Sequence, residues 1–334
     1  MTAALKTPLC DIVLLTWNRA DLLKPCIESI LKHTDVPSRV LVVDNASTDP
    51  EAIAYLNELK KHPGTPLVQL EVIQRANDDG VGAGMNEGLS HTKADWICLA
   101  NNDILVTEGW LSEMIRVASA NPQIGLLNPM SNQFGLTPKN SETVDDLARR
   151  LRPQQGTWLE NWSCVGFCML MPRPVFQKVG LFDPLFGFAY HEDADYSLRA
   201  AQAGFLCAIA EGAYVYHHGG SSLKEDPQND RFFSESGKVF FKKWNRPLSQ
   251  RIAWVSPRLN GSSKEEIRQA LCRLANEDHK IWFFCTQETA SASPNHYNVV
   301  MVRLPKLFFS IAALWKIAAK KKKFQRVIHS PAQT

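Results

Sequence analysis

The stretch Trp96–Leu105, WICLANNDIL, is a short apolar run that is interrupted by Asn101, Asn102 and Asp103 before apolar residues resume. This pattern predicts a buried strand with a carboxylate at its C-terminal end. In open α/β sheets the carboxyl ends of the strands face the ligand crevice, so an acidic residue there is placed to hold a metal or a nucleotide. The alternative is a simple polar turn, because Asn-Asn-Asp is also favourable turn sequence.

The same order of strand, polar loop and helix is found on the N-terminal side of this stretch. Apolar runs at 11–15, 40–43 and 70–74 each end in polar residues, and helical spacing follows the first two at 22–31 and 52–59. Continuous apolar strands that alternate with amphipathic helices are typical of a parallel sheet covered on both faces. The predicted fold class is therefore α/β, with a mainly parallel central sheet flanked by helices and polar loops at one edge.

A glycine-rich loop follows the third predicted strand. Gly80, Gly82 and Gly84 have the spacing GxGxG, and Met85 stands next. This is not the dinucleotide fingerprint, so a Rossmann dehydrogenase is disfavoured. Two interpretations stay open for the glycines: free amides at a helix start that face a phosphate, or close packing of a helix on a strand.

Composition excludes several classes of protein. The chain has 334 residues, enough for one large domain or two, and a net charge of +3 with one late lysine run at Lys320–Lys323. This balance argues against a broad nucleic-acid-binding face. The N-terminus shows no signal-peptide pattern, which predicts a cytoplasmic location. Eight scattered cysteines without CxxC spacing indicate reduced, buried thiols.

Three carboxylates, Glu192, Asp193 and Asp195, lie together at a predicted helix start. The helix macrodipole favours negative charge there and accounts for one or two of them. Phe188 to His191 precede them, and a solvated helix start would not ordinarily follow such aromatic residues. We therefore expect at least one carboxylate to face a partly buried cleft, where its basicity is raised.

Two further segments are candidates for a site. The polar segment 131–155 predicts a long loop with a short helix at 144–151, and such loops often cover active sites. His217 and His218 end the predicted strand 213–216 and are followed by glycines. Two histidines at a strand end suggest a ligand role.

Six motifs occur in a characteristic order. They are TWNR (16–19), VVDNASTD (42–49), NDDGVGAGMNEG (77–88), LANNDI (99–104), GLFDPLFGFAYHEDADYSLR (180–199) and YVYHHGGSS (214–222). Together they resemble the family 2 glycosyltransferases of GT-A fold, especially the bacterial rhamnosyltransferase-like branch, from about Asp11 to Ser222.

The resemblance implies an inverting hexosyl- or rhamnosyltransferase. Such an enzyme moves a sugar from a nucleotide-diphosphate donor to a glycan or lipid-linked acceptor in cell-surface polysaccharide synthesis. The alternative is a catalytically silent nucleotide-sugar-binding module, because Asn101 stands where the DxD-type signature of the family has its first acid.

The resemblance also implies a donor site and a metal site. Asp103, the last residue of the DxD-type signature, and His217 would hold Mn²⁺ or Mg²⁺. His218 is the alternative ligand, because with two adjacent histidines the sequence does not decide which one matches the metal-binding histidine of the family. An imidazole ligand favours Mn²⁺ over Mg²⁺. The implied donor-binding residues are Thr16, Asn18, Asp44, Asn77, Asn86, Asn102 and Asp103.

The catalytic base implied by the resemblance is Asp193 of the ED motif. It would take the proton from an acceptor hydroxyl that attacks the anomeric carbon. Glu192 and Asp195 would then orient groups or cap the helix. Asp195 and Arg199 are spaced i, i+4, for which an ion pair on the helix surface is a sufficient explanation.

The character of the sequence changes after residue 245, so we predict a GT-A domain over 1–245 and a βα extension over 246–334. RIAWVSPRLNG and RVIHS resemble the start of a GT-B glycosyltransferase domain, which suggests an incomplete Rossmann-like half-domain. The extension should have its own parallel sheet, with predicted strands at 252–255, 281–285, 299–302 and 327–329 and helices at 264–276 and 307–319.

The helix predicted at 307–319 has two interpretations. It is too short to span a bilayer, which needs about 20 apolar residues. It can be a buried helix of the βα unit, with Lys320–Lys323 complementing its dipole. Alternatively, it is an amphipathic helix that contacts an anionic membrane surface and places the protein at the inner face of the membrane.

Overall fold

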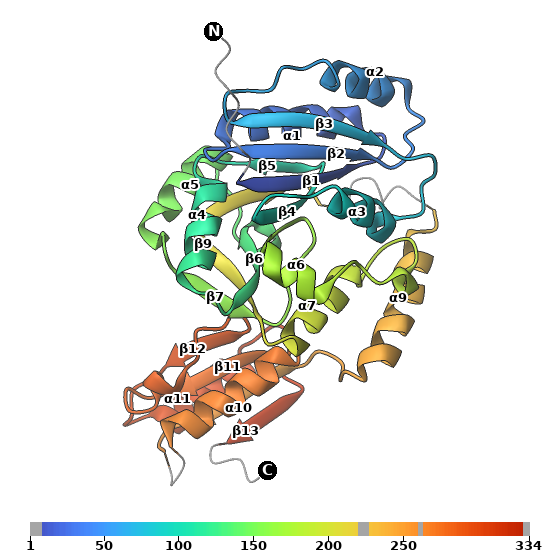
Figure 1. Cartoon of the computed structure of the whole chain (residues 1–334). Helices are drawn as coiled ribbons and strands as arrows, with labels where there is room; N and C mark the ends of the chain where they lie inside the picture. The colour runs from blue at the N-terminus through green and yellow to red at the C-terminus, as the bar shows by residue number, and fades with distance from the viewer. Residues whose placement is uncertain (1–8, 220–226, 260–262, 330–334) are drawn as a thin grey trace. The chain divides into compact units, whose positions relative to one another are not determined.

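The computed structural model describes residues 9–219, 227–259 and 263–329. These residues form two compact units (Figure 1). The first contains the described residues up to Trp158 and those from Ser163 to Trp244, and the second contains Leu159–Trp162 and the described residues from Asn245 onwards. The end of the last predicted motif, Gly220–Ser222, lies outside the described residues.

The first unit is built on a mainly parallel sheet. Its strands are β1 (Cys10–Thr16), β2 (Ser38–Asp44), β3 (Val68–Gln74), β4 (Trp96–Asn101), β5 (Ile104–Val106), β6 (Ile124–Met130), β8 (Cys168–Pro172) and β9 (Leu206–His217), while β7 (Trp158–Asn161) crosses the unit boundary. In the described residues they follow the order β3-β2-β1-β4-β8-β6-β9-β5. β1 lies between β2 and β4 and is parallel to both, whereas β8 and β5 are antiparallel to β4 and β9. The predicted fold class is confirmed.

Helices cover both faces of this sheet. Buried side chains of α1, α2 and α4 pack on one face, and those of α3, α6 and α7 on the other. Asp49 caps α2 through the backbone amides of Glu51 and Ala52, which explains the start of that helix. The helices are α1 (Ala20–His33), α2 (Pro50–Leu59), α3 (Val81–Ser90), α4 (Trp110–Ala120), α5 (Val144–Leu151), α6 (Arg173–Val179), α7 (Glu192–Gln202) and α9 (Asn229–Trp244), with single turns η1 (Asn132–Phe134), η2 (Arg152–Gln154) and η3 (Pro184–Phe186).

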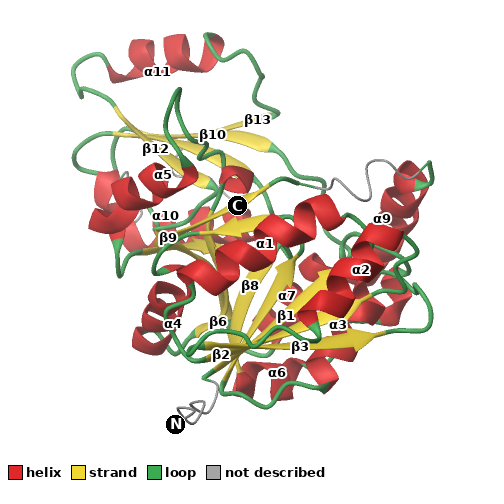
Figure 2. Cartoon of the chain, turned by 90° about the horizontal axis from the view of Figure 1, so that it is seen from above, coloured by secondary structure: helices red, strands yellow, loops and turns green. Residues whose placement is uncertain are grey.

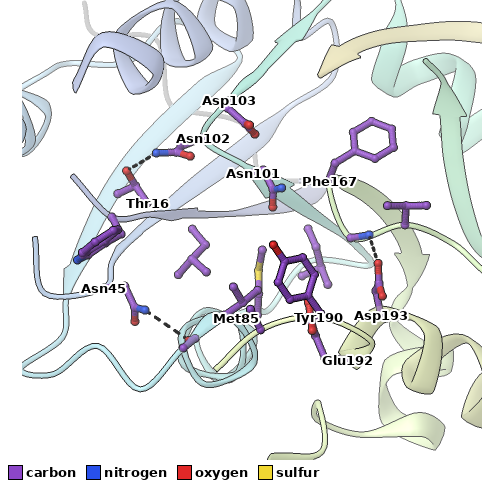
Figure 3. A pocket seen from close by; sticks show the side chains of 18 of the residues that line it. Thr16, Asn45, Met85, Asn101, Asn102, Asp103, Phe167, Tyr190, Glu192 and Asp193 are labelled. Atoms are coloured by element: carbon purple, nitrogen blue, oxygen red, sulfur yellow. Dashed lines mark hydrogen bonds between the residues drawn. The ribbon is translucent and has the colours of Figure 1, made fainter. Parts of the chain in front are cut away.

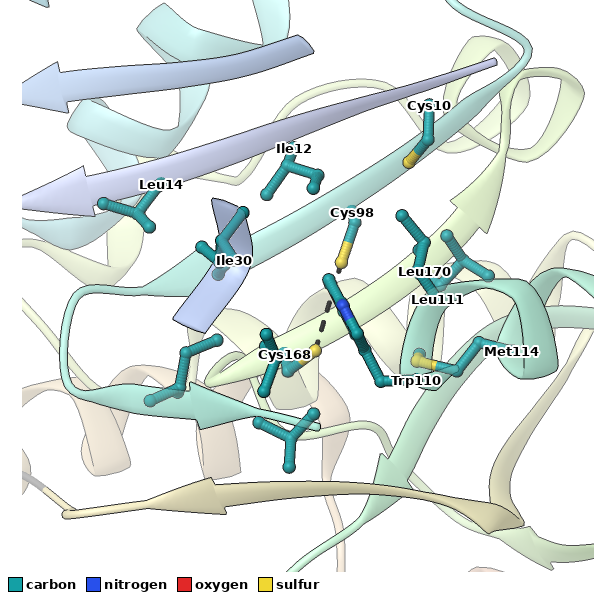
Figure 4. Close-up of a cluster of buried hydrophobic side chains, with 14 of the residues drawn as sticks. Cys10, Ile12, Leu14, Ile30, Cys98, Trp110, Leu111, Met114, Cys168 and Leu170 are labelled. Atoms are coloured by element: carbon teal, nitrogen blue, oxygen red, sulfur yellow. Dashed lines mark hydrogen bonds between the residues drawn. The ribbon is translucent and has the colours of Figure 1, made fainter. Parts of the chain in front are cut away.

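The core of the first unit is dense and contains most of the cysteines. Trp110 is fully buried against the sheet, close to Cys98 and Cys168, whose sulfurs are 4.0 Å apart (Figure 4). Burial raises the pKa of Cys26 to about 12. All eight cysteines are free and all but Cys272 are buried, so the prediction of reduced, buried thiols is confirmed.

The glycines of α3 allow the helix to lie directly on the sheet. A Cβ at Gly84 would come within 2.3 Å of Leu15, and a Cβ at Gly88 within 2.3 Å of Val13. The backbone amides of Gly80 and Val81 at the helix start already donate to Asp78 and Phe188. Of the two interpretations left open for this loop, the geometry favours close packing over a phosphate cradle.

The second unit has its own parallel sheet. Its strands β10 (Arg251–Ser256), β11 (Lys280–Cys285), β12 (Val299–Arg303) and β13 (Arg326–His329) follow the order β12-β11-β10-β13. Each neighbouring pair is parallel. Figure 2 shows α10 (Lys264–Asn276) on one side of this sheet and α11 (Phe309–Ala318) on the other. The predicted βα series is present; its resemblance to a GT-B half-domain stays a prediction.

No helix in the described ranges is both long enough and apolar enough to cross a bilayer.

Candidate functional site

A cavity of about 410 Å³ opens in the first unit where β1 and β4 end (Figure 3). Thr16 is the last residue of β1, and β4 delivers Asn101, Asn102 and Asp103 to the same wall. The opposite wall comes from the start of α3 and from the residues around the start of α7. The predicted placement of a carboxylate at the end of β4 and beside a crevice is confirmed.

Asp103 and His217 form a close pair in this wall. Oδ1 of Asp103 lies 3.1 Å from Nε2 of His217. The antiparallel pairing of β5 with β9 sets Ile104 opposite His217, which explains why residues so far apart in the sequence meet. The side chain of Asn102 is held beside them because its Nδ2 donates to Oγ1 of Thr16 over 2.9 Å.

The two histidines of the doublet have different surroundings. His217 is buried and lines the cavity. His218 is exposed, and its ring packs edge-on against Tyr216. Its contribution to the site is a backbone amide that donates to the carbonyl oxygen of Asp103 over 2.9 Å. The geometry therefore favours His217 as the ligand candidate.

The loop after β6 holds His217 in place. Asn132 accepts from the backbone N–H of His217 over 2.8 Å and donates to its carbonyl oxygen over 2.7 Å. The amide of Gln133 lies 2.7 Å from Nδ1 of the ring, and Phe167 stacks on the ring with centroids 5.0 Å apart. The predicted long polar loop thus begins at the site, and its predicted short helix is α5.

Asp103 and His217 offer one carboxylate oxygen and one imidazole nitrogen to the cavity. No group of three or more His, Cys, Asp or Glu side chains in the described part of the chain is arranged to hold a metal ion. Mg²⁺ and Mn²⁺ are commonly bound through one or two protein ligands together with substrate phosphates and water. The pair therefore fits a cation that is shared with a bound diphosphate.

Asp193 faces the cavity from the first turn of α7. Its Oδ2 accepts from the backbone N–H of Gly166 over 3.0 Å, and its Oδ1 accepts from that of Ala194 over 2.7 Å. Burial raises the pKa of Asp193, and these hydrogen bonds partly oppose that rise. The prediction that a carboxylate of this cluster faces a partly buried cleft is confirmed.

Glu192 lies beside it with a different environment. Oε2 of Glu192 is shielded from solvent and has no hydrogen-bond partner among the described residues, although the residue as a whole is partly exposed. Burial, and secondly the charge of Asp193, raise the pKa of Glu192 from 4.5 to about 8. Asp193 accepts amide hydrogen bonds through both oxygens, and such bonds favour the charged form of a carboxyl group, so we expect the proton of the pair to reside mainly on Glu192.

Helix α9 braces the start of α7. Tyr190 and His191 both have positive φ, of 75° and 62°, a conformation that costs free energy in residues other than glycine. The hydroxyl of Tyr190 donates to Asn229, and Nδ1 of His191 lies 3.0 Å from the hydroxyl of Ser236. These contacts with α9 hold the strained turn that aims Asp193 at the cavity.

Asp195 is not on the surface, which corrects the interpretation of its pairing with Arg199. The ion pair exists, with 2.9 Å between Nε and Oδ2, but the carboxylate is fully buried. Its Oδ1 accepts from Nε1 of Trp244 over 2.9 Å and lies 2.6 Å from Nζ of Lys243. Asp195 therefore anchors the end of α9 to α7.

Four predicted donor residues do not line the cavity. Asn18 accepts from the backbone amides of Thr48 and Asp49 and so ties two loops together. The remaining three are Asp44, which accepts from the amide of Ser47, Asn77, which is exposed, and Asn86, which is bonded to the backbone of Phe182.

Their neighbours in the sequence line the cavity instead. Asn45 and Asp78 face it and are hydrogen-bonded to each other, and Arg75 donates to Asn45. Burial raises the pKa of Asp78. Gly80, with φ of 95°, closes this corner, where a Cβ would lie 2.3 Å from the carbonyl oxygen of Phe188. The cavity wall thus comes from the same sequence motifs as the predicted donor residues but from other positions in them, and the predicted donor-binding roles stay predictions.

The sheet with its strand-end cavity is that of a GT-A glycosyltransferase. Two solved structures share the fold. The crystal structure of GalNAc-T7 with UDP, GalNAc and Mn²⁺ matches with a TM-score of 0.51 and 15% identity, over 71% of this chain and 51% of that one. S. aureus TarS 1-349 in complex with UDP-GlcNAc matches with a TM-score of 0.52 and 13% identity, over 80% of this chain and 72% of that one.

The family follows from the sequence. Residues 11–180, just over half of the chain and all but a few of them in the first unit, match the family described as Glycosyl transferase family 2. The chain belongs to this family. It is also 26% identical over 260 residues to the N-acetylglucosaminyl-diphospho-decaprenol L-rhamnosyltransferase of Mycobacterium tuberculosis, a match that spans 66% of this chain and 80% of that protein.

Proposed function

We propose that this chain is an inverting, metal-dependent glycosyltransferase that moves a sugar from a nucleotide-diphosphate donor to a glycan or lipid-linked acceptor. The observation that carries the proposal is that Asp193 faces the same cavity as the Asp103–His217 pair, from an independent element of the fold. One wall offers ligands for a cation and the other offers a partly buried base. Family membership and the nucleotide-sugar complexes of the fold relatives support the same assignment.

In this proposal the donor lies along the strand ends. Thr16, Asn102 and Asp103 are its first contacts, and Asn45 and Asp78 are added because they line the adjoining wall. Asn18, Asp44 and Asn86 then act by shaping the loops that carry those contacts, and Asn77, which is exposed, keeps its predicted role in the donor site.

Asp103 and His217 would hold Mn²⁺ or Mg²⁺ against the diphosphate. The cation supplies charge stabilisation for the departing nucleotide diphosphate. The protein's own part is to keep the two ligands 3.1 Å apart and oriented, through Asn132, Gln133 and the stacked ring of Phe167.

Asp193 is the proposed base. Its two amide hydrogen bonds fix the carboxylate towards the cavity, while burial raises its pKa and so its basicity. It accepts the proton of the acceptor hydroxyl as that oxygen bonds to the anomeric carbon. The bond from that carbon to the diphosphate breaks on the opposite face, which gives inversion in one step.

The acceptor is proposed from a relative. The mycobacterial relative is named for a decaprenyl-linked sugar diphosphate. By analogy we assign this chain a glycan or lipid-linked acceptor in cell-surface polysaccharide synthesis. The cytoplasmic location predicted from the sequence is kept as part of this proposal.

A panel of nucleotide sugars, with Mn²⁺ and then with a chelator, tests the proposal. Donor turnover that needs the cation supports a glycosyltransferase, and the preferred donor identifies the sugar and the base. Binding of a nucleotide sugar without turnover of any donor, with polyprenyl-linked and glycan acceptors both present, would favour the silent binding module that Asn101 makes conceivable.

A further inference from the structure

Helix α11 is apolar on both of its faces. Phe309 and Ala313 are buried against the sheet of the second unit, with Ile317 partly buried beside them. On the opposite face stand Ile311, Leu314 and Trp315. A helix that covers a sheet and faces water normally carries polar residues on its outer side.

The exposed apolar side chains form one surface. Leu307 and Phe308 precede the helix, and Ile311, Leu314 and Trp315 continue the stripe at helical spacing. Each of the five is between 62% and 83% exposed. Figure 2 shows α11 on the side of the four-stranded sheet opposite to α10. We call these five residues the α11 surface.

Positive charge is concentrated at the same part of the chain. Residues 289–334 contain eight Lys and Arg residues and no Asp or Glu. The whole chain has a net charge of +3, of which this segment supplies +8, so the other 288 residues carry −5. Lys316 and Lys320–Lys323 are all exposed. The cationic character of the protein thus resides in the segment that carries the α11 surface.

Part of this charge has a local explanation. Nζ of Lys323 donates to the carbonyl oxygen of Ala318 at the helix end, over 3.2 Å, and Nζ of Lys320 lies 5.4 Å from the ring centroid of Trp282. Both contacts would stabilise a buried helix. They do not account for Lys321 and Lys322, nor for the apolar outer face.

We propose that the α11 surface binds an anionic lipid bilayer, with the helix lying in the plane of the interface. Aromatic and aliphatic side chains would enter the boundary between head groups and acyl chains, and the lysines would lie at the level of the lipid phosphates. The chemistry of the surface carries this inference independently of sugar transfer, and it adds to the proposed function a means of holding the enzyme at a lipid surface.

Vesicle sedimentation tests the proposal with the full chain. Vesicles of phosphatidylcholine alone are compared with vesicles that contain about one third phosphatidylglycerol, at low and high salt. We expect binding to the anionic vesicles, weakened by salt, and little binding to the neutral ones. Equal binding to both, or none to either, would overturn the proposal.

Two sets of variants assign the binding to this surface. Ile311→Asp with Trp315→Asp should abolish it, whereas Leu248→Asp, an equally exposed apolar residue outside the helix, should not. Lys321→Gln with Lys322→Gln should weaken binding to anionic vesicles by about 25-fold, since each basic residue near such a surface contributes about a factor of five. Unchanged binding in either double variant contradicts the assignment.

Two controls separate this proposal from others. The Asp193→Asn variant should bind vesicles like the wild type, so that failure of sugar transfer and failure of membrane binding are distinguishable. Sedimentation velocity without lipid tests for a second copy as the occupant. A dimer that Ile311→Asp with Trp315→Asp dissociates would assign the α11 surface to self-association and overturn the proposal.

Discussion

The protonation of Glu192 gives a sharp prediction about stability. Glu192→Gln replaces a buried carboxyl group by an amide of the same shape that stays neutral at every pH. In the wild type, burial and the neighbouring Asp193 raise the pKa of Glu192 to about 8. The substitution should therefore change the pH dependence of folding more than folding itself.

The sign and size follow from linkage. Below the unfolded pKa of 4.5, both states of the chain hold the proton and the two proteins behave alike. As the pH rises, the unfolded chain ionises while the folded protein keeps its proton up to about pH 8, so the wild type loses stability over this window. A pKa rise of this size corresponds to about 4 kcal/mol between about pH 5 and pH 9.

Urea unfolding followed by tryptophan fluorescence, at about pH 5, 7 and 9, measures this loss. The free energy of unfolding of the variant should exceed that of the wild type increasingly with pH. Glu58→Gln, on the exposed side of α2, is the matched control and should follow the wild type. Parallel curves for wild type and Glu192→Gln would show that Glu192 is ionised at neutral pH and would refute the reasoning.

Three other substitutions test the site. Asp195→Ala leaves the partly exposed Arg199 and the indole of Trp244 without their buried acceptor and should cost about 2 kcal/mol in urea unfolding, whereas Asp195→Asn should cost less. His217→Ala should reduce Mn²⁺ affinity, measured by titration calorimetry with nucleoside diphosphate present, by about tenfold or more, and His218→Ala should leave it unchanged. Gln133→Leu removes the contact with Nδ1 of His217 and should weaken Mn²⁺ binding by about tenfold, with an unchanged circular dichroism spectrum. Equal Mn²⁺ affinities of Gln133→Leu and the wild type would contradict a positioning role for Gln133.

The sheet and the edge that carries the site could be predicted because they depend on local pattern. Apolar strands that end in polar residues indicate both a buried central sheet and the edge of that sheet at which ligands bind. β4 and its Asn-Asn-Asp end lie where the sequence placed them. The second sheet followed from the same alternation of strands and helices.

The individual contacts depended on geometry that the pattern does not contain. Beyond the end of a strand, the alternation of side chains between the two faces of the sheet no longer decides which residue faces the crevice. The carboxylate of Asp44, for example, accepts from the amide of Ser47, and Asn45 lines the cavity instead. Gln133 reaches His217 through packing across 84 positions of sequence. Asp195 looked like a surface residue because only α9, from later in the chain, buries it.

The proposed sugar transfer requires Asp193 as the base, and one comparison tests this role. Asp193→Asn keeps the shape of the side chain and its place at the start of α7 but cannot accept a proton from the acceptor. The measurement is sugar transfer, with donor affinity determined on the same samples. We expect the rate of transfer to fall by about a hundredfold or more, with donor affinity unchanged. Transfer by Asp193→Asn at the wild-type rate would contradict this role.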